Sequence, residues 1–199
     1  MRLRYNAAMP HRQSRFVHSP LPGIWLLSDA RNDAVLEQVL AALPPGSGVV
    51  FRHYHLEGNA RRARFARVKA AADAQGHAVV LSGDAALAVR WEAAGVYGPP
   101  ARLGPQGRLL RLATAHDAVE IAAANDTGVD GIFLSPVFPT QSHPGAPALG
   151  VEEFRRLAST SQVPVIALGG MNAARAAALR WPRWAAIDGL SHPAMPAAG

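Results

Sequence analysis

Short apolar runs alternate with longer segments of helical periodicity along most of the chain. Residues 33–43 place apolar side chains at Val35, Leu36, Val39 and Leu40, which is the spacing of one helical face. Strands are predicted at residues 24–28, 49–52, 78–81, 95–97, 108–112, 132–135, 163–168 and 185–190. Helices are predicted at residues 33–43, 59–74, 84–93, 117–125, 151–158 and 172–179.

Alternating strands and helices are typical of a parallel sheet covered by helices. Eight such strands that close on themselves form a (β/α)8 TIM barrel, here a small one. An open doubly wound sheet is the competing architecture, but its glycine-rich phosphate fingerprint is absent, because D-A-R-N-D follows the first strand. The sequence therefore predicts an α/β fold with the barrel architecture.

Two helices of an ideal barrel are weak in this sequence. The segment G-P-P-A-R-L-G-P-Q-G after the fourth strand predicts a loop with a reduced helix. The final S-H-P-A-M-P-A-A-G has two prolines and no apolar period, so no clear final helix is predicted. A barrel without its last helix leaves an apolar flank exposed, and we therefore expect a homodimer in which the partner covers it.

Residues 1–21 differ in composition from the rest of the chain. They contain Arg2, Arg4, Arg12 and Arg15 and no acidic residue, and we expect a flexible basic tail. Residues 22–199 fit a single domain. The net charge is +6, but the arginines are scattered and no basic stripe is interleaved with aromatic residues, so no nucleic-acid partner is predicted.

Composition excludes several kinds of chemistry. The chain has no cysteine, which removes disulfides, thiolate catalysis and cysteine-based metal sites. No apolar run approaches the roughly 18 residues that span a membrane, and the first 20 residues lack the apolar centre of a signal peptide. We expect a cytoplasmic protein that does not associate with membranes.

The stretch 129–150 is the strongest candidate for an active-site loop. A buried-strand pattern leads into a rigid connection with Pro136, Pro139, Pro144 and Pro147, and a helix begins after Gly150. In βα folds, the loop that follows a strand carries the chemistry.

A second candidate is a phosphate site near the end of the chain. Gly169 and Gly170 follow the seventh strand and precede a helix with Asn172 as its predicted cap. Glycines here let backbone N–H groups approach an anion, and barrels commonly bind phosphate after strands seven and eight. Ser191 can add a hydroxyl donor.

Several histidines are candidates for proton transfer or anion contact. His116 lies just past the fifth strand, two residues after Thr114, and imidazole titrates near neutral pH. A solvated histidine at a helix start is the alternative reading. His143 lies in the candidate loop, where it contacts an anion when protonated or lies on the surface.

His53 and His55 are predicted to share one face of the second strand, two residues apart. No third ligand is evident, so no metal site is predicted. Arg52 and Tyr54 point to the opposite face. If that face is the barrel interior, Arg52 is a buried cation that needs an anionic partner.

Four motifs resemble the thiamine phosphate synthase and thiazole tautomerase (TenI-like) family. They are G-I-F-L-S-P-V-F-P-T with a downstream A-P-A-L-G, V-P-V-I-A-L-G-G-M, I-W-L-L-S-D, and T-A-H before a D-A-V-E helix. The resemblance covers roughly residues 24–191. It implies a (β/α)8 barrel, commonly dimeric, that acts in thiamine biosynthesis on a small-molecule thiazole phosphate.

The resemblance implies one of two activities. The synthases join the thiazole phosphate to a hydroxymethylpyrimidine diphosphate with Mg²⁺ and release pyrophosphate. The tautomerases isomerise a thiazole carboxylate phosphate and need no metal.

The chain departs from the synthase pattern where the diphosphate and metal bind. Arg52 is retained, but His53 and Tyr54 replace the Glu and Lys that follow it in synthases. Leu81 lies where the first magnesium aspartate is expected, and no acid follows the fourth strand before Asp117. Because Mg²⁺ needs hard oxygen ligands, no cofactor is predicted, except Mg²⁺ if the chain is a synthase.

Metal-free proton transfer or weakened activity is therefore the favoured function, with His116 matching the proton-transfer histidine of the tautomerases. An active synthase with a remodelled diphosphate site and a non-catalytic binding or regulatory barrel remain alternatives. The predicted substrate-binding residues are Arg52, Thr114, Pro136, Thr140, His143, Gly169, Gly170 and Ser191.

Overall fold

Eight parallel strands close into a barrel in which each strand pairs with its neighbours in sequence order. The computed structural model describes residues 21–142, 145 and 147–191. The strands are β1 (Ile24–Leu27), β2 (Gly48–Phe51), β3 (Ala78–Ser82), β4 (Gly95–Gly98), β5 (Leu110–Ala115), β6 (Gly131–Leu134), β7 (Val165–Ala167) and β8 (Trp184–Ala186). The α/β prediction and its (β/α)8 TIM-barrel architecture are confirmed.

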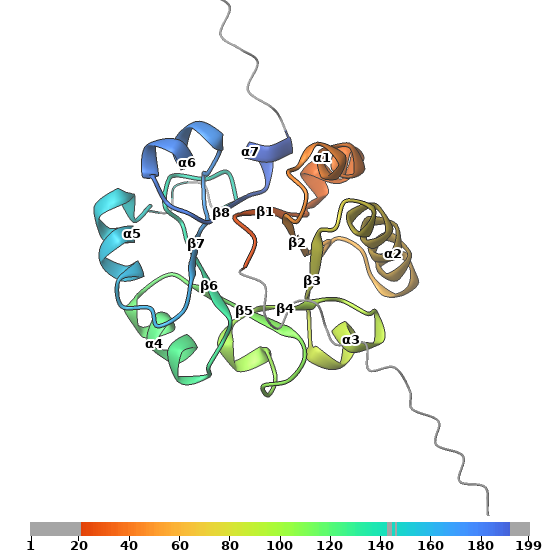
Figure 1. Cartoon of the computed structure of the whole chain (residues 1–199), viewed down its shortest axis with the longest axis horizontal. Coiled ribbons are helices and arrows are strands. Elements are labelled where there is room, and N and C mark those ends of the chain that lie inside the picture. Colours follow the sequence, from red (N-terminus) through yellow and green to blue (C-terminus); the bar gives the residue numbers. More distant parts are fainter. Residues whose placement is uncertain (1–20, 143–144, 146, 192–199) are drawn as a thin grey trace, which may run out of the picture.

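Helices surround the barrel as an outer ring (Figure 1). They are η1 (Ala30–Val35), α1 (Leu36–Ala42), α2 (Gly58–Ala74), α3 (Ala85–Arg90), η2 (Pro100–Arg102), α4 (Ala118–Asp126), α5 (Gly150–Ala158), α6 (Ala173–Leu179) and α7 (Asp188–Ser191). The reduced helix expected after β4 is the three-residue η2. Asn172 caps α6 as predicted, since its side chain accepts the N–H of Arg175.

The prediction for the last strand was wrong in its extent. The apolar run predicted a strand over residues 185–190, but β8 ends at Ala186 and α7 begins at Asp188. Gly189 allows this turn, because a Cβ there would lie 2.0 Å from the carbonyl oxygen of Met171. The backbone after β8 therefore turns against the loop after β7 instead of continuing as a strand.

Aromatic side chains fill the barrel interior. Trp25 on β1 meets Phe133 on β6 edge to face, with 5.6 Å between ring centroids. These strands are not neighbours in the barrel, so the contact crosses the interior. Tyr97 on β4 meets the same Phe133 ring at 5.1 Å. Gly48 leaves room for the indole, because a Cβ at this position would lie 2.2 Å from the Trp25 ring.

A second apolar layer lies between the barrel and the helices. Strand side chains alternate between the two layers, as the period of a strand requires. Leu26, for example, packs outward with Leu36 and Leu40, while Trp25 and Leu27 point inward. None of the helices in the described part of the chain has the length and apolar character needed to cross a membrane.

Two expectations concern the ends of the chain. The predicted basic tail falls almost entirely on residues 1–20, which lie outside the described residues. The final segment S-H-P-A-M-P-A-A-G lies, apart from Ser191, outside the described residues. The absence of a last helix and the homodimer inferred from it therefore stay predictions.

The central position of Phe133 gives a stability prediction. Phe133→Ala leaves a cavity in the interior and is expected to lower the free energy of unfolding by about 3–5 kcal/mol. Val119→Ala, at a side chain that is 77% exposed, is expected to change it by less than about 0.5 kcal/mol. Urea unfolding followed by circular dichroism measures both. If both substitutions change the free energy of unfolding equally, the contacts of Phe133 across the interior are not a main element of the core.

Candidate active site

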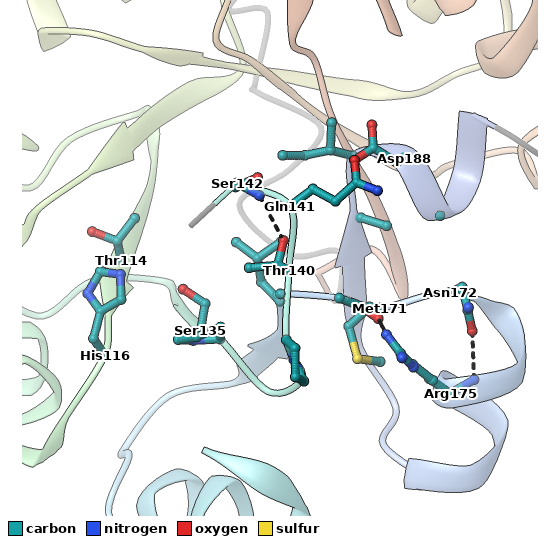
Figure 2. A pocket seen from close by; sticks show the side chains of 18 of the residues that line it. Thr114, His116, Ser135, Thr140, Gln141, Ser142, Met171, Asn172, Arg175 and Asp188 are labelled. Carbon is teal, nitrogen blue, oxygen red and sulfur yellow. Dashed lines mark hydrogen bonds between the residues drawn. The ribbon is translucent and has the colours of Figure 1, made fainter. Parts of the chain in front are cut away.

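A cavity of about 670 Å³ opens at the carboxyl-terminal mouth of the barrel. Its lining comes from the ends of β2, β4, β5, β6, β7 and β8 and from the loops that follow them. Figure 2 shows these side chains converging from separate loops. The structure brings together Arg52, Thr114, His116, Pro136, Thr140, Gly169 and Gly170, which are predicted site residues.

The two other predicted site residues do not join this group. His143 lies outside the described residues. Ser191 does not line the cavity: it is buried at the end of α7, and its hydroxyl donates to the carbonyl oxygen of Ile187 at 2.8 Å. Its neighbours Asp188 and Gly189 face the cavity instead. The run of residues after β8 was misread as a strand, which misplaced the serine.

The loop after β6 is held against the end of β7. The N–H of Val137 donates to the carbonyl oxygen of Leu168 at 2.9 Å, and the N–H of Phe138 donates to that of Gly169 at 3.1 Å. The loop also closes on itself, since the N–H of Gly150 donates to the carbonyl oxygen of Val137 at 3.0 Å. The described parts of this segment, residues 135–142 and 147–150, are thus tied to β7 and form one wall of the cavity.

The glycine pair after β7 is explained by this close approach. Gly169 and Gly170 have positive φ angles of 95° and 62°, where glycine is favoured. A Cβ on Gly169 would lie 2.5 Å from Cα of Pro136, and one on Gly170 would lie 2.5 Å from the carbonyl oxygen of Pro139. The glycines are therefore required by the packing of two loops, whatever ligand the cavity holds.

His116 lies at the cavity edge and is oriented by Glu120. One carboxylate oxygen of Glu120 accepts the backbone N–H of His116 at 2.7 Å and contacts imidazole Nδ1 at 2.8 Å. A carboxylate accepts only, so Nδ1 carries the proton and Nε2 remains the proton acceptor of the neutral ring. The sequence analysis did not identify Glu120 as this partner, because His116 lies before α4 and only the turn at the Asp117 cap brings Glu120 back to it.

The anionic partner expected for Arg52 is Asp29. Nη2 of Arg52 donates to Oδ2 of Asp29 at 2.8 Å, and the arginine side chain is 17% exposed. Burial alone would raise the pKa of Asp29, but hydrogen bonds from Arg31 and the charges of Arg31 and Arg52 outweigh it and hold that pKa below its ordinary value. Asp29 is therefore a carboxylate that fixes one of the cations of the cavity.

Further charged residues at the mouth were not predicted. Arg31 donates to Asp188 at 2.8 Å and to the hydroxyl of Ser142 at 3.0 Å, which joins the loops after β1, β6 and β8. Arg175 on α6 donates to the carbonyl oxygen of Gly170, and its guanidinium lies 5.0 Å from the ring centroid of Phe138. No sequence motif marked these arginines.

A second cavity of about 730 Å³ adjoins the first, and Tyr97 and Thr114 line both. Burial raises the pKa of Tyr97 well above its ordinary value, so its phenol is neutral. Tyr54, at the rim, makes a 2.7 Å hydrogen bond with the hydroxyl of Ser82. This side of the barrel mouth thus offers hydroxyl groups where the other side offers arginines and an imidazole.

The prediction for His53 and His55 was partly wrong. β2 ends at Phe51, so neither histidine lies on the strand. Their rings are still neighbours, with centroids 5.1 Å apart. Neither lines the two cavities of the described structure.

Comparison with known sequences agrees with the family resemblance of the motifs. A family model described as thiamine monophosphate synthase matches residues 25–190. A thiamine-phosphate synthase of Thermobifida fusca is 31% identical over 166 residues, which is 75% of this chain and 74% of that protein. One of Myxococcus xanthus is 43% identical over 72 residues, which is 36% of this chain and 32% of that protein. The alignments with the first three curated relatives cover only 32%, 33% and 33% of their length.

Comparison with solved structures supports the same fold. A thiamine phosphate pyrophosphorylase of Pyrococcus furiosus superposes with a TM-score of 0.68 at 18% identity, over 85% of this chain and 88% of that one. One of Bacteroides thetaiotaomicron gives 0.57 at 12% identity, over 84% and 82%. At these identities the likeness establishes the barrel and not the chemistry.

The Arg52–Asp29 pair gives a pH prediction. A carboxyl whose pKa is lowered by folding contributes stability at pH values above its ordinary pKa, and the contribution is lost as pH falls through the folded pKa. Asp29→Asn is expected to lower the free energy of unfolding by about 1 kcal/mol or more at pH 7. Below about pH 4 the loss becomes progressively smaller. Urea unfolding from pH 7 to pH 2.5 measures the difference. Asp73→Asn, at an exposed surface pair, is the control. If the difference in free energy of unfolding between Asp29→Asn and wild type does not become smaller in acid, Asp29 is not the charged partner of Arg52.

Proposed function

The chain belongs to the thiamine monophosphate synthase family, and from this premise we propose that it binds a thiazole phosphate in the mouth of the barrel and moves a proton on it without a metal. His116 is the proposed acid–base residue. The observation that carries the proposal is an oriented imidazole beside the guanidinium groups of Arg52 and Arg175, in a cavity whose described lining contains one carboxylate, that of Asp188.

The residues present do not fit Mg²⁺. Leu81 is fully buried and apolar where the resemblance expects a magnesium ligand. The acids that line the two cavities in the described residues are Asp84 and Asp188. Asp84 accepts the N–H of Leu87 as a helix cap, and Asp188 is paired with Arg31. No step of the proposed reaction therefore passes through magnesium.

The proton transfer rests on the Nδ1–H form of His116. With Nδ1 donating to Glu120, Nε2 is the basic nitrogen that takes a proton from one position of a thiazole carboxylate. The same nitrogen returns the proton at a second position, so the reaction is a net isomerisation. Acid–base catalysis of this kind contributes about 10²–10⁴-fold in rate.

The phosphate is assigned to the end of the cavity at Gly170 and Arg175. The guanidinium of Arg175 has five donors, of which one described contact, to the carbonyl oxygen of Gly170, uses one. Its position over the Phe138 ring keeps it beside the cavity. Charge-assisted hydrogen bonds from arginine to phosphate are among the stronger polar contacts in proteins.

A synthase reaction is the second candidate, and the second cavity favours it. A space next to the first, joined through Tyr97 and Thr114, is what a two-substrate reaction needs. Arg102 is the cation in its lining. His53, which replaces the Glu of the synthase pattern, is fully buried and lines neither cavity, which weighs against this candidate.

One assay separates the candidates. Purified protein is incubated with a thiazole carboxylate phosphate alone. In a parallel reaction it is incubated with the thiazole phosphate, hydroxymethylpyrimidine diphosphate and Mg²⁺. Isomerisation without metal supports the proposal, and magnesium-dependent formation of thiamine phosphate supports the synthase. Binding by calorimetry with neither reaction supports the non-catalytic barrel. If the protein binds no thiazole phosphate, the isomerase, the synthase and the non-catalytic binding barrel are all contradicted.

The role of His116 leads to a matched pair of substitutions. His116→Asn is expected to lower kcat at least about 100-fold and to change the calorimetric Kd for the thiazole phosphate less than about twofold, because the imidazole acts on the proton and not on the phosphate. Equal losses in kcat and affinity would contradict this division.

Arg175→Met is expected to weaken ligand binding more than it lowers kcat, which is the opposite of the effect expected for His116→Asn. Loss of a charge-assisted contact of about 1.5–3 kcal/mol raises Kd by about 10-fold or more, with a smaller effect on kcat. Arg156→Met serves as the control, because Arg156 pairs with Glu153 on the exposed face of α5. If Arg175→Met binds the ligand as wild type does, the phosphate lies elsewhere in the cavity.

A further inference from the structure

A group of three potential metal ligands lies outside both cavities. Asp33 in η1 and His53 and His55 in the loop after β2 each offer one ligand atom, and these atoms lie within 4.8 Å of one another. The sequence had shown only the two histidines. The fold adds the carboxylate, because η1 and the loop after β2 come from neighbouring strands of the barrel.

We propose that Asp33, His53 and His55 form a binding site for Zn²⁺ or a related first-row transition metal. Two imidazoles and one carboxylate are a ligand set found for such ions, with water in the remaining position. Mg²⁺ prefers an all-oxygen shell with near-octahedral geometry. The site is therefore different in chemistry and place from a diphosphate–magnesium site in the cavity.

His53 is held as a preorganised ligand. Its ring is fully buried and stacks on Phe51 with centroids 4.5 Å apart. Nδ1 makes a 2.7 Å hydrogen bond with the hydroxyl of Ser28, and Nε2 makes one of 2.8 Å with Asp33. A second hydrogen bond on the far nitrogen is the usual support of a metal-bound histidine, and the Ser28 hydroxyl can accept as well as donate.

The backbone of His53 also needs an explanation. Its φ is 36°, a left-handed conformation that costs a non-glycine residue free energy and marks functional positions when surrounding contacts enforce it. The ring does not line the cavity and lies beside η1, where it contacts Asp33. Arg52, the preceding residue, faces the cavity instead.

The carboxylate of Asp33 is oriented by Arg64. Nε of Arg64 donates to Oδ1 of Asp33 at 2.5 Å, and the guanidinium also binds both carboxylate oxygens of Glu37. Glu37 offsets the charge of the buried Arg64, while Arg67, which lies 3.6 Å from Glu37, is mostly exposed to solvent. Oδ2 of Asp33 accepts no hydrogen bond from the residues described, and it is the oxygen assigned to the metal.

His55 completes the site from the solvent side. Its side chain is exposed and makes no hydrogen bond within the described structure, so it is free to close on an ion. At Zn–N and Zn–O lengths of about 2.0 Å, tetrahedral ligand atoms lie about 3.3 Å apart. When the ion binds Nε2 of His53, the ring takes its other tautomer: the proton leaves Nε2 and a proton is carried on Nδ1, which then donates to the Ser28 hydroxyl. The 2.8 Å contact with Asp33 lengthens and His55 moves inward.

The test uses the full chain in metal-free buffer with Zn²⁺, followed by calorimetry, and with Co²⁺, followed by its visible absorption. The expected result is one ion per chain and a rise in Tm, because an ion that binds only the folded state stabilises it. His55→Asn is expected to lower the affinity at least 10-fold and to abolish the Tm rise. Its Tm without metal is expected to match wild type, because His55 makes no hydrogen bond in the described part of the chain.

Other histidines of the chain provide the controls. The double variant His11→Asn/His18→Asn removes two histidines of the N-terminal segment, and His116→Asn removes the exposed histidine of the cavity. Both are expected to bind Zn²⁺ as wild type does. The proposal is overturned if His55→Asn binds with unchanged affinity, if either control removes the site, or if no stoichiometric binding occurs. Because none of these readouts involves thiazole phosphate, they are independent of the proposed function.

Discussion

The packing across the barrel interior is the constraint on which the rest of this structure depends. Trp25, Tyr97 and Phe133 come from three strands that are not neighbours, and their rings meet in the centre. A barrel of eight strands closes only when its interior is filled by side chains. Once it is closed, the carboxyl ends of all strands lie at one mouth. The distant residues Arg52, His116 and Gly170 reach one cavity for that reason.

The two sides of the barrel mouth differ in the chemical groups that line them. On the side of β5 to β8, the lining contains an oriented histidine and Arg175 beside a rigid loop. On the side of β3 and β4, hydroxyl groups of Tyr54, Ser82 and Tyr97 predominate. The first side is the one to which the proposal assigns the phosphate. The second side also contains one cation, Arg102, and one acid, Asp84, in the described lining.

Much of the fold could be predicted from the sequence, because strand and helix periods are local properties of the chain. The alternation of apolar runs, the capping role of Asn172 and the reduced helix after β4 all depend on residues near one another. The error at β8 arose because an apolar run is compatible with either a strand or a buried turn. Only the contact of Gly189 with Met171, residues on different loops, decides between them.

Residues of the candidate site could be predicted from the sequence only where they stand in a recognisable motif. The glycine pair and His116 stand in motifs that follow predicted strands, so their place at the mouth followed from the barrel. Arg31 and Arg175 have no such mark, since an arginine on a helix is usually solvated. The carboxylate partner of Arg52 was expected but not identifiable, because 23 positions separate Arg52 from Asp29 and several other acids were equally possible.

The glycine contacts described above also have an evolutionary consequence. After β6, β7 and β8, the loops meet backbone against backbone at Gly169, Gly170 and Gly189, so a change in one loop requires a matching change in the next. After β2 and β3, the loops meet through side chains, as in the bond between Tyr54 and Ser82. Such loops can diverge one residue at a time.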